Sequence, residues 1–205
     1  MNTKKLTTVR RQLEVLSQEH FLKVFCGSIF LYFKEVINNL VNKYSHPCVV
    51  VDEVIPIRII NDKYDTIALT VGYGPFVICY NVDNMGENKN EIMSDAIHEF
   101  LHMWFNTYSY EERSSVIKCI CNETMHVLGD DIILQAKYSI RMVYMSEMLN
   151  EYSFSEDLYY GEEVLCELAS HLKSPVREIV FNIIINREIL KKDLDDLSKK
   201  LHELL

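Results

Sequence analysis

The sequence has little glycine and proline, with 6 and 4 residues respectively among 205. Small all-β domains depend on these residues for tight turns, so their scarcity favours helices. Long apolar runs are also missing: the most apolar stretch, residues 21–33, contains Lys23 and is too short to cross a bilayer. Apolar residues still make up 48% of the chain and charged residues 25%. This composition predicts a packed core within a single domain rather than disorder.

Basic residues are fewer than acidic ones, 21 against 30, which gives a formal net charge of −9. A general nucleic-acid binder neutralises phosphates with lysine and arginine, so the balance argues against that class and we expect no nucleic-acid partner. Secretory and membrane-spanning segments are not visible, and the 6 cysteines form no C-x-x-C pair. We therefore expect reduced thiols in a cytoplasmic protein that has no membrane partner.

The pattern of apolar residues divides the chain into helices, a short sheet and more helices, which predicts an α+β fold that is mainly helical. The sheet of about three strands is expected over β-branched and aromatic segments, at residues 48–60, 65–71 and 75–82. The turn 70–75 contains Gly72 and Gly74. Helices are expected at residues 6–18, 20–43, 89–106, 110–128, 131–150, 160–173, 175–188 and 189–204.

One of these helices carries the sequence His98-Glu99-Phe100-Leu101-His102, an H-E-x-x-H motif. Positions i and i+4 share a helix face, so both imidazoles can reach one cation such as Zn²⁺. Glu99 is about 100° further around the helix, beside the metal, where it can take a proton from a metal-bound water. The motif therefore predicts a zinc site on His98 and His102, with Glu99 as catalytic base.

The rest of the same helix supports this interpretation. On a helical wheel the polar residues fall within one narrow arc, and apolar and aromatic side chains such as Phe100 and Trp104 cover most of the remainder. The polar arc consists of Glu91, Asp95, His98, Glu99, His102 and Asn106. The alternative is an ordinary amphipathic helix whose wet face holds two histidines and a glutamate by chance.

A strand at residues 76–82, a short polar loop and a buried H-E-x-x-H helix together resemble the zincin metallopeptidases. The resemblance implies a zincin-like packing of the small sheet on the motif helix, and an extended substrate lying along residues 76–82. It also implies a single zincin-like domain over residues 1–205. In this division residues 1–46 form N-terminal helices, 47–173 the metallopeptidase-like core and 174–205 C-terminal helices. The extended signature, with a further Gly and His directly after the motif, is absent from residues 103–108.

Gluzincin-type members of this family take their third zinc ligand from a glutamate on a later helix. Glu162 is the first choice because Ala169 follows it by seven positions, as a small residue often does in the family. Glu163 is its rival. Glu167, four residues after Glu163, is a candidate to support Glu163 without binding the metal itself. Glu123 is a third candidate, at a separation from His102 close to that of thermolysin-like enzymes.

These residues predict a zinc-dependent metallopeptidase that hydrolyses peptide bonds of a protein or peptide substrate through a zinc-bound water. Small gluzincin-like proteins of bacteria and phages often cut a single partner such as a repressor. The alternative is a catalytically inactive zincin-like module that binds a protein, in a regulatory or mobile-element role. Leucines at near-heptad spacing in residues 190–204 also suggest a homodimer through the C-terminal helix.

Overall fold

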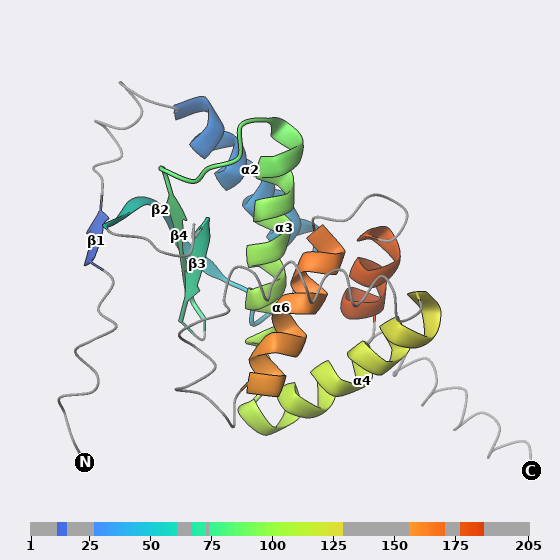
Figure 1. The fold of residues 1–205 in the computed structure, drawn as a ribbon. Helices are drawn as coiled ribbons and strands as arrows, with labels where there is room; N and C mark the ends of the chain where they lie inside the picture. Colours follow the sequence, from blue (N-terminus) through green and yellow to red (C-terminus); the bar gives the residue numbers. More distant parts are fainter. Residues whose placement is uncertain are drawn as a thin grey trace, which may run out of the picture.

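A computed structural model describes residues 12–15, 27–60, 67–72, 74–128, 156–170 and 177–186. Helices lie on one side of a small sheet (Figure 1), which confirms the α+β class. In chain order the elements are β1 (Gln12–Val15), α2 (Gly27–Tyr44), β2 (Val51–Ile60), β3 (Ala68–Val71), β4 (Phe76–Asn81), α3 (Lys89–Phe105), α4 (Tyr110–Leu128) and α6 (Glu156–Ser170). Residues 177–186 form a further helix.

The sheet has four strands in the order β1-β2-β4-β3. Strands β2 and β4 run parallel, while β1 pairs with β2 and β3 with β4 in antiparallel fashion. The three strands expected from the sequence are confirmed. The expected turn between β3 and β4 is confirmed as well, with positive φ at Gly72 and Gly74, a conformation that glycine adopts without steric cost.

The helix expected over residues 6–18 is wrong for its described part, because Gln12–Val15 is strand β1. It pairs with the end of β2, from Gln12 opposite Ile60 to Val15 opposite Ile57. Its apolar residues fit a helical period and a strand period equally well over so short a segment. The partner that decides between them lies more than 40 residues away in the sequence, where a local pattern carries no information about it.

The two faces of β4 meet different surroundings. Phe76, Ile78 and Tyr80 are buried in the large core under the helices, as period-2 alternation requires. The ring of Phe33 on α2 stacks on Tyr80, with centroids 3.9 Å apart. The intervening Cys79 belongs to a second, smaller apolar cluster with Ile57 and Ile59 of β2 on the opposite face. The sheet therefore has a helix-facing side, and that side supports the motif helix.

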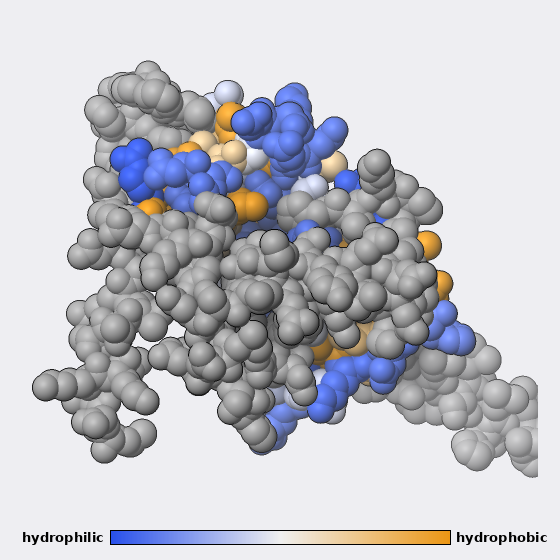
Figure 2. Space-filling model, in the orientation of Figure 1, coloured by the Kyte–Doolittle hydropathy of each residue, from blue (hydrophilic) through white to orange (hydrophobic). Residues whose placement is uncertain are grey.

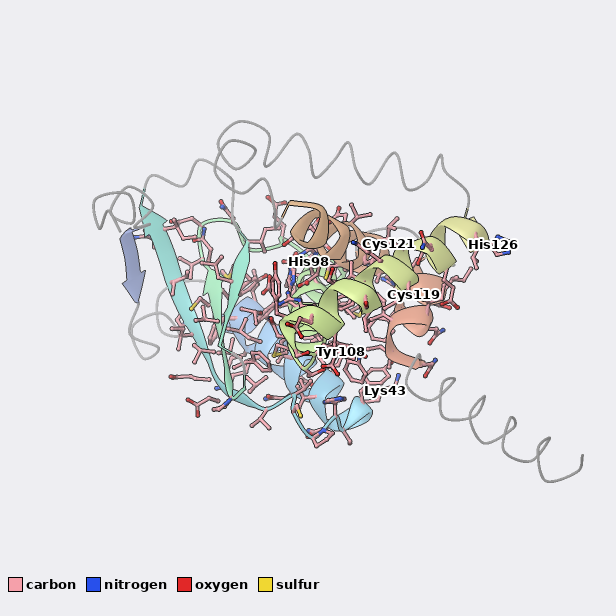
Figure 3. All side chains as sticks on the ribbon, turned by 90° about the horizontal axis from the view of Figure 1, so that it is seen from below. Lys43, His98, Tyr108, Cys119, Cys121 and His126 are labelled. Carbon is pink, nitrogen blue, oxygen red and sulfur yellow. The ribbon has the colours of Figure 1, made fainter. Side chains whose placement is uncertain are left out.

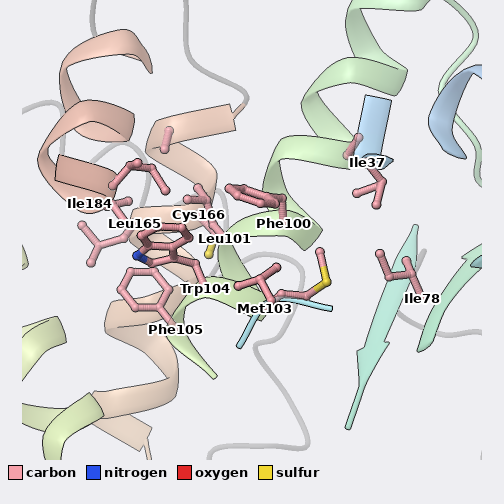
Figure 4. Close-up of a cluster of buried hydrophobic side chains, with 14 of the residues drawn as sticks. Ile37, Ile78, Phe100, Leu101, Met103, Trp104, Phe105, Leu165, Cys166 and Ile184 are labelled. Atoms are coloured by element: carbon pink, nitrogen blue, oxygen red, sulfur yellow. The ribbon is translucent and has the colours of Figure 1, made fainter. Parts of the chain in front are cut away.

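Helix α3 lies between the sheet and α6, in contact with both (Figure 1). Its apolar side chains Phe100, Leu101, Trp104 and Phe105 are almost completely buried. Figure 4 shows them against Leu165 and Cys166 of α6 and Ile184 of the last described helix. This packing fixes the rotation of α3, so the remaining strip of the helix has a defined orientation toward its neighbours.

Helix α4 packs against α6 and has the bounds expected from the sequence. Ile117, Ile120 and Thr124 are buried at helical spacing, while its outer side is hydrophilic (Figure 2). None of the helices in the described ranges is long and apolar enough to cross a membrane. The helices expected at residues 131–150 and 189–204, and with them the predicted dimer contact, lie outside the described residues.

Candidate metal centre

The motif helix begins and ends at well-defined caps. Asn88 is the N-cap, and its side-chain oxygen accepts hydrogen bonds from the backbone N–H groups of Asn90 and Glu91 at 3.0 and 3.2 Å. Asn106 is the C-cap, and its backbone N–H donates to the carbonyl of His102. Between these caps His98 and His102 are four residues apart and project from one face. His98 lies between the sheet and the α4 and α6 helices (Figure 3).

The two imidazoles face each other and a carboxylate of α6. The Nε2 atoms of His98 and His102 are 3.1 Å apart. The carboxylate of Glu163 lies against both, with Oε2 3.3 Å from Nε2 of His98 and Oε1 3.3 Å from Nε2 of His102. Glu163 is only 4% exposed, so its carboxylate is held inside the protein beside the two rings. These three side chains form a group that can hold a metal ion.

The spacing of these donor atoms fits zinc. In a tetrahedral site with bonds of about 2.0–2.1 Å, neighbouring ligand atoms lie about 3.3 Å apart. The separations of 3.1 and 3.3 Å among His98, His102 and Glu163 are close to that value. Two imidazole nitrogens and one carboxylate oxygen are also the donor set of a catalytic zinc site that keeps one position open. The composition and the spacing of the group therefore suit a divalent metal ion, zinc among them.

Glu162, the first choice for the third ligand, has a different position. Its Oε1 atom lies 2.7 Å from Nδ1 of His102, on the opposite side of the ring from Nε2. Its carboxylate also pairs with Arg113, whose Nε donates to Oε2 at 2.7 Å. The structure thus brings the rival Glu163, and not Glu162, to the pair of Nε2 atoms. Adjacent glutamates differ by about 100° around a helix, and the rotation of α6 decides which one faces the rings.

Glu99, the expected base, is anchored to the sheet. It is 6% exposed, and its Oε2 atom accepts a hydrogen bond of 2.6 Å from the hydroxyl of Thr70 on β3. The hydroxyl has one proton to donate, so this bond holds one of the two carboxylate oxygens. Glu99 is not in the group that can hold a metal. This placement agrees with a base beside the metal rather than a ligand to it.

Electrostatics couple the members of the site. Burial raises the pKa of the Glu163 carboxyl, but the imidazoles of His102 and His98 more than offset this and hold its pKa well below its ordinary value. Burial lowers the pKa of His102, but Cys166, Glu163 and Glu162 around it outweigh burial and raise that pKa well above its ordinary value. Burial raises the pKa of the Cys166 thiol to about 12. Without metal, the site therefore favours a protonated His102 that is paired with a carboxylate.

A second buried polar contact ties the motif helix to the sheet one turn earlier. The Tyr80 hydroxyl of β4 donates to Oδ2 of Asp95 at 2.9 Å, and both residues are buried. Burial and the neighbouring Asp95 raise the pKa of Tyr80, which keeps the phenol protonated as the donor. Asp95 belongs to the predicted polar arc, but it is 4% exposed and contacts protein rather than solvent. Of the arc, Asp95 and Glu99 are buried, His98, His102 and Asn106 are partly buried and only Glu91 is exposed, so most of the arc faces protein.

The other residues considered from the sequence lie apart from this group or outside the described structure. Glu123 is exposed on α4 and is not part of the metal-holding group. His126 is likewise exposed on α4. None of the cysteines in the described ranges forms a disulfide.

Two residues of the site were not expected from the sequence. Thr70 reaches Glu99 across 29 positions, and Arg113 reaches Glu162 across 49. Neither residue belongs to a local motif with its partner. A threonine in a strand and an arginine near the start of a helix are common for many other reasons, so no pattern in the sequence identifies them.

The expected path of an extended substrate along residues 76–82 is wrong. Strand β4 lies inside the sheet, paired with β2 on one edge and β3 on the other, so both of its edges are already hydrogen-bonded. Among the described strands, β3 ends the sheet on the side that carries Thr70 and contacts α3. The sequence showed the strands, but the order of strands depends on pairing between distant segments.

No family model, curated protein or solved structure matches this chain. The arguments about this site therefore depend on its own geometry and chemistry.

Proposed function

We propose that this protein is a zinc-dependent metallopeptidase of the zincin kind, with His98, His102 and Glu163 as ligands. The observation that carries the proposal is the convergence, within 3.1–3.3 Å, of the Glu163 carboxylate of α6 and both Nε2 atoms of α3, the helix that also carries Glu99. Bound zinc supplies a Lewis acid and lowers the pKa of a water ligand to about 7. The chain supplies the ligands, the base and the orientation of both.

Each residue has a distinct task in this proposal. Glu99 takes the proton of the attacking water and passes it to the leaving amine, a role for which a positioned carboxylate is suited. Thr70 holds Oε2 of Glu99, so we assign the moving proton to Oε1. Glu163 supplies negative charge beside two neutral imidazoles, which balances part of the charge of a divalent ion. The buried surroundings of these groups strengthen their electrostatic effects.

We also propose that the substrate is a polypeptide in extended conformation that pairs with the outer edge of β3. This edge lies at the end of the described sheet, and Thr70 on β3 connects it directly to Glu99. Backbone hydrogen bonds to a strand edge are a general means of holding an extended peptide. The net charge of −9 favours neutral or basic peptides over acidic ones.

The test combines metal analysis with cleavage of a complex peptide mixture, read by mass spectrometry. Wild-type protein is expected to bind one zinc and to generate new peptide termini. Glu99→Gln should keep the zinc and lose cleavage by about 10²-fold or more, since the base is removed without removing a ligand. His98→Ala should lose the zinc. Glu111→Gln and His126→Ala, which change exposed residues of α4, serve as controls.

The same measurements separate the peptidase from a protein-binding module on the same scaffold. Zinc retained by wild-type protein without any new peptide termini supports a module that binds its partner and does not cut it. Absence of zinc from wild-type protein that was purified and reconstituted with zinc would overturn the metal site and the peptidase together. Cleavage by Glu99→Gln equal to that of wild type would contradict the role of this base.

A further inference from the structure

Three helices meet at a chain of polar contacts behind the metal site. His102 on α3 contacts Glu162 on α6 through its Nδ1 atom. Arg113 on α4 holds the same carboxylate with two nitrogens, Nε on Oε2 at 2.7 Å and an Nη on Oε1 at 2.5 Å. A further Nη of Arg113 donates to the side-chain oxygen of Asn106, the C-cap of α3. The contacts thus lead from the metal-facing ring through two other helices and back to the end of its own helix.

The N-terminal turn of α4 places Arg113 at the contact with Glu162 and Asn106. Ser109 and Glu112 form a capping box: the backbone N–H of Ser109 donates to Oε2 of Glu112 at 3.1 Å, and Glu112 N–H donates to Oγ of Ser109 at 3.4 Å. Arg113 therefore lies in the first turn of a helix with a fixed beginning. Its guanidinium binds one carboxylate in a fork, a geometry that lysine cannot reproduce.

Close packing of α4 on α6 brings the partners together. Gly161 directly precedes Glu162, and a Cβ atom at this position would lie 3.0 Å from Cγ2 of Ile117 on α4. The Sγ atom of Cys121, one turn further along α4, would lie 3.6 Å away. A larger residue at 161 would therefore require Ile117 to shift, close to the Arg113–Glu162 pair. The glycine therefore permits the approach on which the contacts depend.

We propose that Arg113 and Glu162 are positioning residues for the metal ligand His102, an inference that rests on the metal site proposed above. Glu162 accepts the Nδ1–H of His102, which fixes the tautomer whose Nε2 lone pair faces the metal. Arg113 holds Glu162 in place and keeps it from turning toward the metal beside Glu163. The two adjacent glutamates thereby have separate tasks: Glu163 binds the metal, and Glu162 orients the ligand His102 through its Nδ1 atom.

Burial explains why the arginine is needed for this arrangement. Glu162 is 1% exposed, and burial of a carboxylate without a cation carries a large desolvation cost, which favours its displacement. Such a displacement weakens the acceptor of the Nδ1–H bond. Removal of only one partner from a buried pair leaves the other charge uncompensated, whereas removal of both leaves a neutral arrangement. The contribution of Arg113 should therefore depend on the charge of Glu162.

The test is a double-mutant cycle on zinc affinity, measured by competition with a chromophoric chelator in the full-length protein. Arg113→Met and Glu162→Gln are each expected to weaken zinc binding by about 10- to 100-fold. The double variant R113M/E162Q should bind zinc at least as tightly as the single variant with the lower affinity. The reason is that a neutral glutamine oxygen can still accept a hydrogen bond from His102. Arg113→Lys should recover only part of the loss, because it keeps the charge and loses the fork.

The controls separate positioning from general effects on folding. Arg58→Ala removes an exposed arginine of β2 that pairs with Asp83, and it should leave zinc affinity within about twofold of wild type. The d–d absorption spectrum of the Co²⁺-loaded protein should change in Arg113→Met and stay unchanged in Arg58→Ala. If Arg113→Met folds and binds zinc as tightly as wild type or more tightly, or if the two losses simply add, the proposal is overturned. Cleavage plays no part in this readout, so an effect of Arg113 on zinc in a protein that cuts nothing would support this inference while contradicting the peptidase.

Discussion

The two faces of helix α3 are held by different forces. One face consists of large apolar side chains, Phe100 and Trp104 among them, that are buried against α6 and the last described helix. The other face carries His98, Glu99 and His102, each contacting a polar partner from the sheet or from α6. Apolar contacts tolerate exchange for other apolar groups of similar volume, but buried charges require particular partners. We therefore expect the first face to determine stability and the second to determine metal binding.

The largest effect on stability is expected from the apolar face. Phe100 is 0% exposed, and Phe100→Ala removes a ring from the centre of the core. Loss of buried area and the remaining cavity should reduce the free energy of unfolding by about 3–5 kcal/mol. Denaturation by urea in the presence of a chelator measures this. Leu31→Ala, at a side chain that is 51% exposed, is the control and should change stability by less than about 0.5 kcal/mol. Equal effects of the two substitutions would contradict the division between the faces.

Zinc binding at the polar face should depend on pH rather than on side-chain volume. His102 has a pKa well above its ordinary value of 6.5 in the metal-free protein, so it is protonated at neutral pH and zinc must displace that proton. Zinc affinity should therefore rise with pH, by about tenfold per pH unit for each proton released, until the pH exceeds the raised pKa. Chelator competition between pH 6 and 9 would measure this. A flat profile through neutral pH would show that zinc binding releases no proton from the site.

The smallest effect is expected at the contact between the polar face and the sheet. Thr70→Val removes the hydroxyl that donates to Glu99 and keeps the shape of the side chain. Peptide cleavage should fall by roughly three- to tenfold, because one hydrogen bond that orients the base is lost. Zinc content should not change, since Glu99 is not in the metal-holding group. Thr70→Ser restores the hydroxyl and should restore most of the rate. Loss of zinc from Thr70→Val would contradict the separation of base and ligands.

The difference between the two faces also explains how much the sequence could predict. Apolar periodicity is a local property, so the bounds of α3 and α4 and the positions of β2, β3 and β4 agree closely with expectation. The spacing of His98 and His102 is local as well, and it predicted two facing imidazoles correctly. The prediction for the segment that forms strand β1 was wrong, because only its pairing with Ile57–Ile60 distinguishes it from a helix.

The polar partners of the site depend on tertiary packing. Choosing between Glu162 and Glu163 requires the rotation of α6 against α3, and a family pattern with a small residue seven positions later favoured the glutamate that turns toward Nδ1. Arg113 and Thr70 come from elements that approach the site only once the helices and the sheet have packed. Sequence reasoning therefore brought together the two histidines of one helix and missed Thr70 and Arg113, which reach the site from other elements.

The account depends most directly on what lies between His98, His102 and Glu163. A crystal structure of the zinc-reconstituted protein, with anomalous diffraction recorded at the zinc absorption edge, tests this in one measurement. The account predicts a single zinc peak at about 2.0–2.1 Å from both Nε2 atoms and bound by a Glu163 oxygen, with Glu162 still on Nδ1 of His102. A peak elsewhere, no peak at all, or a zinc bound by Glu162 in place of Glu163 would contradict it.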